Sequence, residues 1–307
     1  MKQIWRRPWL GPLAALLGVY VLFALLAPGT FLGMANLTTM ARQTVVVAIT
    51  SLGMSFVILL GGIDLSVGSA VALTSVVVAS LLDAGWSPAA AVALGCATPA
   101  LSGLITGTLT TRAQLTPFIV TLGSMSVLRG IAKGLADEQK VDADPRGLDL
   151  LMSSGTLPAG VFLALGLAVL ATLVLEYTVF GRHVLAIGSN ARTAQLCGVP
   201  VQRVTLLVYA LAGALTGVAG VLEFSTLTVG DPTDSIGLEL DAIAAVVIGG
   251  GSLAGGQGSV PGAMLGALLM TVIKTGCTHV GVPNWVQEIV TGTIIVIAMG
   301  IDRLRRR

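Results

Sequence analysis

The organisation of the chain depends on residues 188–200, which read GSNARTAQLCGVP. This segment is short and polar, and apolar runs at 158–179 and 203–227 flank it on both sides. Each run reaches the length of about 20 residues that a helix needs to cross a membrane. Asn190 suits the N-cap of a short helix, and Gly198 with Pro200 suits its end. We therefore expect a short helix in water between two membrane spans.

The composition places the whole chain in a membrane. Of its 307 residues, 54% are hydrophobic and only 10% are charged, whereas soluble domains carry about 25% charged residues. The apolar runs have the length of helices and not the alternation of a membrane β-barrel. The net charge of +2 gives no indication of nucleic-acid binding, and the lipid bilayer is the expected surroundings. The three cysteines show no disulfide framework and no metal-ligand spacing.

The predicted fold is an all-α integral membrane domain that covers residues 1–307. We place spans near 10–27, 43–61, 66–83, 88–111, 116–135, 158–179, 203–227, 238–252, 258–278 and 284–302, about ten in all. The third and eighth are short and interrupted by glycine. The start of the chain resembles a signal peptide, but its apolar core nearly reaches span length and no A-x-A site follows. We therefore expect an uncleaved first span.

The distribution of charge predicts the orientation. Basic residues lie in one set of loops and acidic residues in the other when ten crossings are assumed. The basic set is Lys2, Arg6, Arg7, Arg112, Arg182, Arg192, Arg203, Arg303, Arg305, Arg306 and Arg307. The acidic set is Asp83, Asp137, Glu138, Asp142, Asp144, Asp149, Asp231 and Asp234. Because basic loops stay in the cytoplasm, both termini and the segment 188–200 are expected there.

The same count permits an inverted repeat. Spans two to five and seven to ten are offset by five, an odd number, so a repeat between them would be inverted across the membrane. The two halves share only loose similarity, so the sequence itself shows no repeat.

The short cytoplasmic helix has two interpretations from its residues. A helix of fewer than about 12 residues is marginal in water and needs a surface to pack on. Ala191, Ala194 and Cys197 form a stripe of small side chains, while Arg192 and Gln195 point elsewhere. The helix is either an ordinary linker packed on its own chain or a docking element for a cytoplasmic partner.

Several long motifs resemble the membrane subunits of ribose-type sugar ABC importers. They are GRHVLAIGSNARTAQLCGV, VYALAGALTGVAGVLEFS, ELDAIAAVVIGGGSLAGGQGSVPGAMLGALL and GGIDLSVGS, and the similarity runs from about Asn36 to the C-terminus. The resemblance implies that the loop 180–203 carries the coupling helix, which fits a groove on the ATP-hydrolysing subunit. The residues that it assigns to docking are Asn190, Ala191, Arg192, Ala194, Gln195, Cys197, Gly198 and Val199.

The resemblance also implies partners and a substrate class. It implies an ATPase with two nucleotide-binding domains, usually fused, a second permease that is identical or related, and a periplasmic sugar-binding protein. We expect the binding protein to dock on the loops near 137–157 and 228–238. The location would be the inner membrane of a bacterium, and the cargo a small neutral sugar or polyol. The chain has no phosphate-binding GxxxxGK[ST] motif, since Gln257 follows Gly256, so ATP and Mg would sit on the ATPase.

Two constellations are candidates for the translocation path or its gate. Asp64 and Ser66 follow the turn Gly61–Gly62, and Asp64 either caps the next helix or lies on the path. Glu239 and Asp241 open a span that ends in a glycine-rich break, Gly249, Gly250 and Gly251. This break either lines the path or allows close helix packing.

An ion-gradient-driven carrier is the alternative function. Glu223, Lys274 and Glu288 lie in or near later spans, and such a carrier needs charge near the middle of the membrane. Lys274 and Glu288 lie toward span ends, where they can reach the interface, and His183 and His279 read as interface residues. The sequence shows no catalytic Ser, His and Asp set, so we expect no enzyme.

Overall fold

The computed structural model describes residues 10–153 and 157–305. The elements in chain order are α1 (Leu10–Leu26), α2 (Pro28–Phe31), α3 (Met34–Leu60), α4 (Val67–Asp83), α5 (Pro88–Arg112), α6 (Pro117–Leu135), β1 (Val141–Asp142), the 3-10 helix η2 (Leu148–Met152), α7 (Ala159–Tyr177), α8 (Val179–Ser189), α9 (Ala191–Leu196), α10 (Val201–Leu227), β2 (Val229–Gly230), α11 (Leu238–Ile248), α12 (Val260–His279) and α13 (Asn284–Arg305). The predicted all-helical fold is confirmed. Lys2, Arg6, Arg7, Arg306, Arg307 and part of the predicted docking loop at 154–156 lie outside the described residues.

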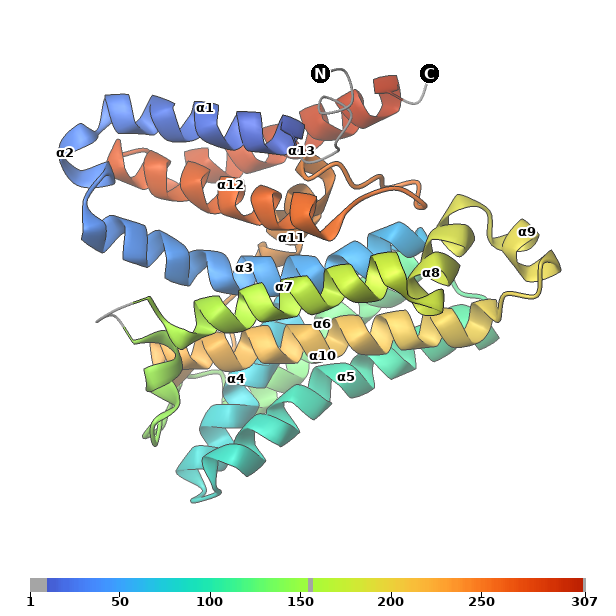
Figure 1. Ribbon diagram of the computed structural model, residues 1–307. Helices are drawn as coiled ribbons and strands as arrows, with labels where there is room; N and C mark the ends of the chain where they lie inside the picture. Colours follow the sequence, from blue (N-terminus) through green and yellow to red (C-terminus); the bar gives the residue numbers. More distant parts are fainter. Residues whose placement is uncertain (1–9, 154–156, 306–307) are drawn as a thin grey trace.

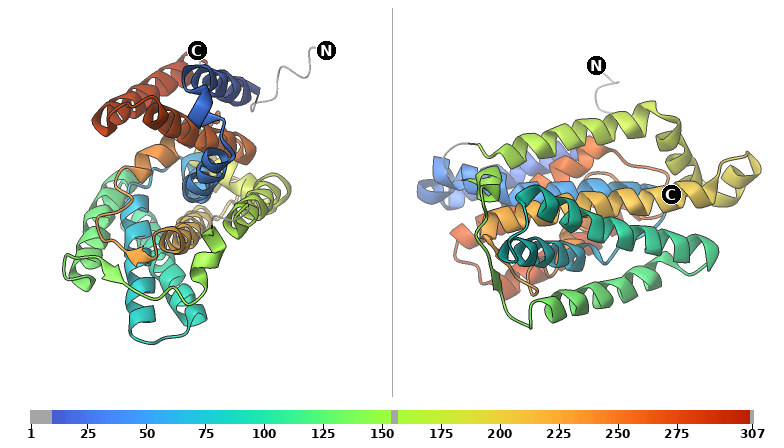
Figure 2. Two further views of the ribbon diagram at one scale, coloured as in Figure 1. Left: turned by 90° about the vertical axis from the view of Figure 1, so that its left-hand side faces the viewer. Right: turned by 90° about the horizontal axis from the view of Figure 1, so that it is seen from below.

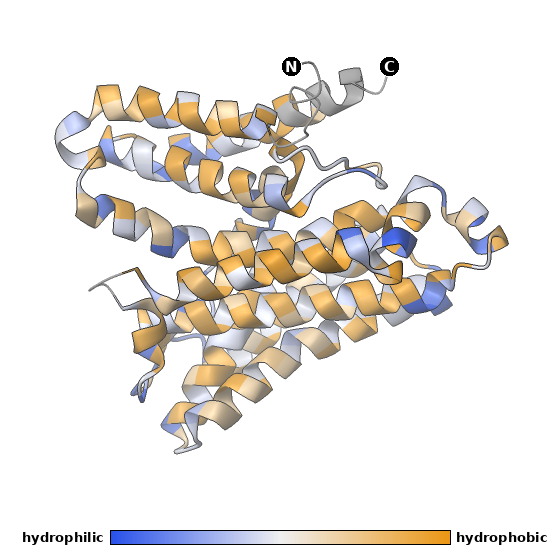
Figure 3. Cartoon of the chain, in the orientation of Figure 1, coloured by the Kyte–Doolittle hydropathy of each residue, from blue (hydrophilic) through white to orange (hydrophobic). Residues whose placement is uncertain are grey.

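The long helices lie roughly side by side, and the bundle therefore has two ends (Figure 1). We call the end that carries α9 the α9 end, and the end that carries β1 and β2 the β end. Apolar residues cover most of the helices between these ends (Figure 3). Within the described residues, six helices are long and apolar enough to cross a membrane, namely α3, α5, α6, α7, α10 and α12. The shorter apolar helices are α1, α4 and part of α13.

Helices α3 and α10 form the interior of the bundle, with the others around them (Figure 2). Each is 27 residues long and is followed by a non-helical segment and a shorter helix. Glycines allow α5 and α10 to pack closely. Gly103 of α5 lies against the backbone of Tyr209, and Gly213 of α10 lies against the backbone of Pro99. This is the small-residue packing that membrane helices use in place of a hydrophobic driving force.

The helix boundaries match most of the predicted spans within a few residues. The predicted span 43–61 is the largest difference, because α3 begins nine residues earlier, at Met34. The early turns of α3 carry Asn36, Thr38 and Thr39, whose polar side chains hid them from a search for apolar runs. Helix α8 was not predicted separately. It begins after a break at Thr178, whose hydroxyl accepts a hydrogen bond from Gly181 N at 3.1 Å.

Two long segments in which no span was predicted meet at the β end. β1 and β2 pair antiparallel, with Val141 opposite Gly230 and Asp142 opposite Val229. The segment between α6 and α7 is thereby joined to the segment between α10 and α11. These two segments contain the loops that we expected to dock a binding protein, and the β pair joins them at residues 141–142 and 229–230.

Candidate functional site: a docking helix and a polar interior

Helix α9 has the caps that the sequence predicted. Asn190 Oδ1 accepts a hydrogen bond from Thr193 N at 2.9 Å, as an N-cap does. At the other end Gly198 has φ of +83°, and Val199 N donates to Ala194 O at 3.0 Å. A left-handed residue at this position favours glycine. The six-residue helix is therefore fixed at both ends, although it is too short to be stable alone.

The surface of α9 differs from the predicted stripe of small residues. Ala194 is buried at 5% exposure and packs on the apolar core of its own chain, whereas Ala191 and Cys197 are exposed. Leu196, which the sequence analysis passed over, is 82% exposed. The helix projects beyond the ends of α7 and α10 (Figure 1). Its inward face thus anchors it through Ala194, and its outward face presents Leu196 with Arg192 and Gln195.

A junction of backbone contacts ties this helix to the transmembrane part. Gly188, near the end of α8, lies so close to Leu59 O and Gly256 N that a side chain at this position would collide with both. Gly256 N donates a hydrogen bond to Leu59 O at 2.9 Å. The last turn before α9 therefore touches the end of α3 and the loop between α11 and α12 directly.

A groove of about 720 Å³ lies beside α9 at the same end of the bundle. Ala191, Gln195 and Val199 form one wall, and the turn Gly61–Gly62 forms another. Tyr209 of α10 also lines it. The hydroxyl of Tyr209 is buried and has no hydrogen-bond partner among the described residues.

Asp64 and Ser66 lie at the first turn of α4. Asp64 is 7% exposed, and its Oδ1 accepts hydrogen bonds from Ser66 N at 2.8 Å and from Ser66 Oγ at 2.6 Å. A carboxylate here is favoured by the positive end of the helix dipole. Both bonds come from Ser66, the residue before α4, and no side chain among the described residues caps the first turn of this helix, so the capping role of Asp64 and its role on the path both stay predictions.

Gly249, Gly250 and Gly251 end helix α11. Their amides donate to the carbonyl groups of Ala245, Val247 and Val246 at 2.8–3.0 Å. Gly249 also lies directly against Gly262 of α12. These contacts favour the interpretation of the break as a close packing element between α11 and α12.

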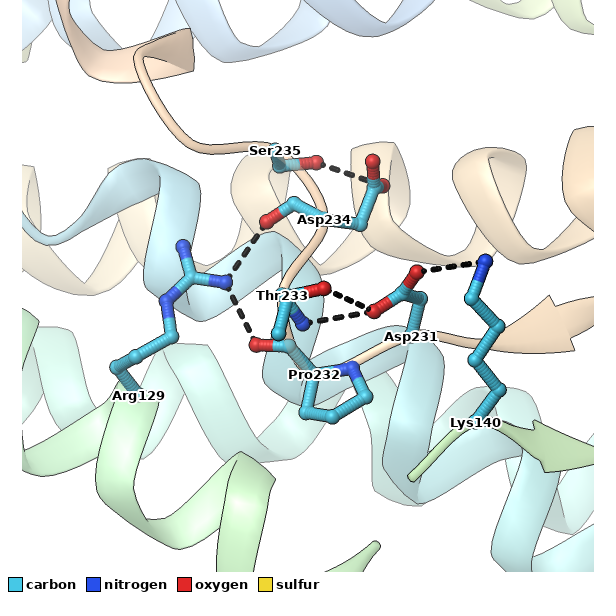
Figure 4. A network of polar contacts seen from close by, with 7 residues as sticks. All are labelled: Arg129, Lys140, Asp231, Pro232, Thr233, Asp234 and Ser235. Carbon is cyan, nitrogen blue, oxygen red and sulfur yellow. Dashed lines mark hydrogen bonds and ion pairs between the residues drawn. The ribbon is translucent and has the colours of Figure 1, made fainter. Parts of the chain in front are cut away.

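A polar network holds the loop between α10 and α11 at the β end (Figure 4). Lys140 pairs with Asp231 at 3.1 Å, and Thr233 donates to Asp231 from its N–H and its hydroxyl at 2.8 and 2.7 Å. Arg129 of α6 donates to the carbonyl oxygens of Pro232 and Asp234 at 2.8 and 2.7 Å. Burial raises the pKa of Asp231, but the hydrogen bonds from Thr233 and the charge of Lys140 outweigh it and hold this pKa below its usual value.

From this network the chain runs inward along α4. Gly230 lies against Val76 of α4, and Ser235 lies against Gly68, eight residues or about 12 Å nearer the start of that helix. A methyl group on Gly68 would lie 2.5 Å from Glu239 Oε2. The first turns of α4 and α11 therefore meet inside the bundle, where Glu239 lies against Gly68. The 11 residues of α11 span about 16 Å, roughly half of a membrane core.

Asp241 faces a different helix. It is 4% exposed, and its Oδ2 pairs with the ammonium group of Lys274 in α12. Its Oδ1 is buried without a partner among the described residues. The Lys274 side chain is 44% exposed, and its ammonium group is directed at this carboxylate of α11. Glu288 is exposed, and Glu223 is partly buried on α10.

The sequence analysis missed Leu196, Gln43 and Arg129. Leu196 lies four residues before Pro200 in a segment read as polar. A large apolar side chain in such a segment was the signal that could have identified it. Gln43 and Arg129 were signalled by their position within apolar runs, where polar side chains mark functional sites.

Comparison with known proteins places these features in a family. Residues 36–299 match the family described as branched-chain amino acid transport system / permease component. The chain is 37% identical to the ribose import permease protein of Bacillus subtilis, over 96% of this chain and 92% of the relative. It is 36% identical to the ribose import permease protein of Escherichia coli K12, over 99% and 98% of the two chains.

A third relative is the L-arabinose ABC transporter permease protein of Azospirillum brasilense, which is 35% identical over 93% of this chain and 86% of the relative. No solved structure matches the chain significantly. The match covers nearly all the described helices, including α9 and the loop between α11 and α12. The chain is therefore a multi-pass membrane protein and belongs to this family of transport-system permease components.

Proposed function

We propose that the chain is the membrane-spanning permease subunit of an ATP-binding-cassette importer that moves a small neutral carbohydrate into the cytoplasm. The observation that carries the proposal is full-length similarity to ribose and arabinose permeases. The chain itself catalyses no reaction and binds no ATP, and ATP with Mg acts on a separate ATPase subunit. The comparisons give no support to the ion-gradient-driven alternative.

The cargo is a sugar or polyol and not an amino acid. The description of the family names branched-chain amino acids, but the similar full-length relatives carry ribose or arabinose in their names. Asp241 of α11 is already paired with Lys274, so it offers no free charge to the ammonium group of an amino acid, which favours a neutral cargo.

The chain crosses the inner membrane of a bacterium about ten times with both termini in the cytoplasm. In this topology the six long helices, the shorter α1, α4 and α13, and the half-length α11 make the ten crossings. The α9 end is then cytoplasmic and the β end periplasmic. The equal lengths of α3 and α10, each followed by a broken connection, support an inverted repeat between the two halves.

Helix α9 is the coupling helix of the loop 180–203. Arg192, Gln195 and Leu196 contact the ATPase, and Asn190, Ala194, Gly198 and Val199 hold the helix in place. When ATP closes the two nucleotide-binding domains, which are fused in one chain, α9 moves. The junction of Gly188, Leu59 and Gly256 passes this movement to α3 and to the α11–α12 loop. The helices then rock against a second permease, which is identical or related. The path thereby opens alternately to the two sides of the membrane.

The periplasmic sugar-binding protein docks at the β end. The loops 137–157 and 228–238 support this assignment because a β pair and the Lys140–Asp231 ion pair hold them together as one surface. An exposed acidic surface favours a partner with basic residues at its rim. The cargo would then be released above the turns at 232–237 that lead to α11.

Mass spectrometry of proteins that co-purify with the chain tests the proposal. The chain is solubilised mildly from its native membrane with nucleotide and a crosslinker. We expect an ATPase of the cassette type and a sugar-binding protein. Recovery of the chain with neither partner would contradict the proposal.

A further inference from the structure

A second cavity lies between α3 and α12 in the half of the bundle toward the β end. It measures about 370 Å³, within the range of about 300–1,000 Å³ typical of small-molecule sites. Nine residues line it, and Val47 alone among them is apolar. We call it the α3–α12 cavity. It shares no lining residue with the groove beside α9.

The polar groups of this cavity are held in place by contacts between α3 and α12. Thr275 Oγ1 donates to Gln43 Oε1 at 3.1 Å, and His279 Nε2 lies 2.8 Å from Asn36 Oδ1. Because the carbonyl of Gln43 is engaged in this way, its amide N–H groups stay available as donors. Gln43 is exposed, which in this cavity means that a ligand can reach it.

The charges around the cavity balance. Lys274 lines it, and its ammonium group pairs with Asp241 of α11. An ion that is already paired gives no net attraction for an anion or a cation. Amides and hydroxyls both donate and accept hydrogen bonds, as the hydroxyls of a ligand do. The cavity therefore suits a neutral ligand rich in hydroxyl groups.

The two sides of α3 differ in polarity. Ala41, Thr44 and Val45 line an apolar groove of about 550 Å³ between α1, α3, α7 and α12. Gln43 lies on another side of the same turns, nine residues or about 14 Å from the start of α3. A polar side chain at this depth is unfavourable against lipid and marks a water-filled pathway.

We propose that the α3–α12 cavity binds the neutral, polyhydroxylated cargo during its passage, through Gln43, Thr275 and Lys274. This assignment rests on the proposed function as a carbohydrate permease. The proposed binding site lies on α3 and α12. It is separate from the first turns of α4 and α11, which the sequence analysis proposed as part of the path.

Cysteine labelling in the assembled importer tests the assignment. Cys96, Cys197 and Cys277 are first replaced by Ala or Ser, and Gln43→Cys is introduced into this background. Thr44→Cys is the matched control, because Thr44 lies at the same depth and lines the apolar groove instead of the α3–α12 cavity. A charged, membrane-impermeant methanethiosulfonate is added from the periplasmic side of membranes that contain the whole importer. Gln43→Cys should react at least about tenfold faster than Thr44→Cys, since thiol reactivity follows exposure to water.

Protection by cargo tests the ligand class. D-ribose, L-arabinose, xylitol and myo-inositol are tested singly, with L-leucine as the comparison. The transported sugar or polyol, at about ten times its Kd, should slow the labelling of Gln43→Cys about tenfold, and leucine should not. An unreactive Gln43→Cys, equal labelling of both variants, protection by leucine, or no protection by any sugar or polyol would overturn the assignment.

The outcomes separate this assignment from the proposed function. Uptake that depends on the ATPase, combined with an unreactive Gln43→Cys, overturns the cavity assignment and leaves the importer proposal intact. Uptake that persists without the ATPase overturns the importer proposal whatever the labelling shows.

Discussion

Leu196→Ala should weaken binding of the ATPase and leave the permease itself intact. Leu196 is 82% exposed on α9, so nearly all of its side chain is available to a partner. The substitution removes three carbons, and each buried CH₂ contributes about 0.8 kcal/mol, so about 2.4 kcal/mol of binding free energy is lost. Since about 1.4 kcal/mol is a factor of ten, Kd should rise about 50-fold. The free energy of unfolding of the permease alone should change by less than about 0.5 kcal/mol.

The assay is a titration of the permease in nanodiscs with its ATPase subunit, followed by biolayer interferometry. Thr193→Ala is the matched control, since Thr193 is also exposed on α9 and its cap bond to Asn190 uses the backbone N–H. This control should change Kd by less than about threefold. Ala194→Arg should behave oppositely, because Ala194 is buried in its own chain and a charge there lowers the stability of the permease. A Kd for Leu196→Ala within threefold of the wild type would refute the docking geometry.

Three other changes test the interior and the β end. Gly188→Ala should lower the Tm, because the added methyl group meets the carbonyl oxygen of Leu59 near the end of α3, and the free energy of unfolding should fall by about 1–3 kcal/mol. An unchanged Tm would argue against a tight junction. Lys274→Met should cost about 1–3 kcal/mol of stability in detergent, since it leaves the buried Asp241 unpaired, and adding Asp241→Leu should recover most of the loss. If Asp241→Leu recovers none of the stability lost in Lys274→Met, the two side chains are not coupled. The lowered pKa of Asp231 means that its ion pair with Lys140 contributes stability above about pH 3.9, the pKa of an unfolded aspartate, and loses it as the pH falls through the lower folded value. The protection factors of the β2 amides, which correct for the pH dependence of intrinsic exchange, should therefore be equal at pH 7 and pH 5 and fall only below about pH 4, and a lower protection factor already at pH 5 would contradict this.

The local features of the fold follow from the sequence because their causes are local. The cap of Asn190 on Thr193 and the left-handed Gly198 act within a few residues, and both are where the sequence predicts them. The ends of most apolar runs coincide with helix ends for the same reason, since membrane thickness sets the length of a span.

The features that the sequence did not predict depend on contacts between distant segments. Ala194 faces inward and Leu196 outward because of how α9 packs on its own chain, and small-residue spacing does not specify this. Lys274 and Asp241 are 33 positions apart, and Gln43 and Thr275 are 232 apart. A search along the chain has no information on such pairs. The turns before α11 are a further case, since their polar residues read as an ordinary loop and their contact with α4 depends on the close approach at Gly230 and Gly68.

Uptake by a reconstituted system tests whether the chain serves an ATP-driven importer. Proteoliposomes carry the permease, its ATPase and its binding protein, with ATP on the ATPase side, and labelled D-ribose or L-arabinose is offered on the other. We predict uptake that continues when ionophores collapse all ion gradients and stops when the ATPase is omitted or catalytically inactive. Uptake that follows an ion gradient and proceeds without the ATPase would contradict this prediction.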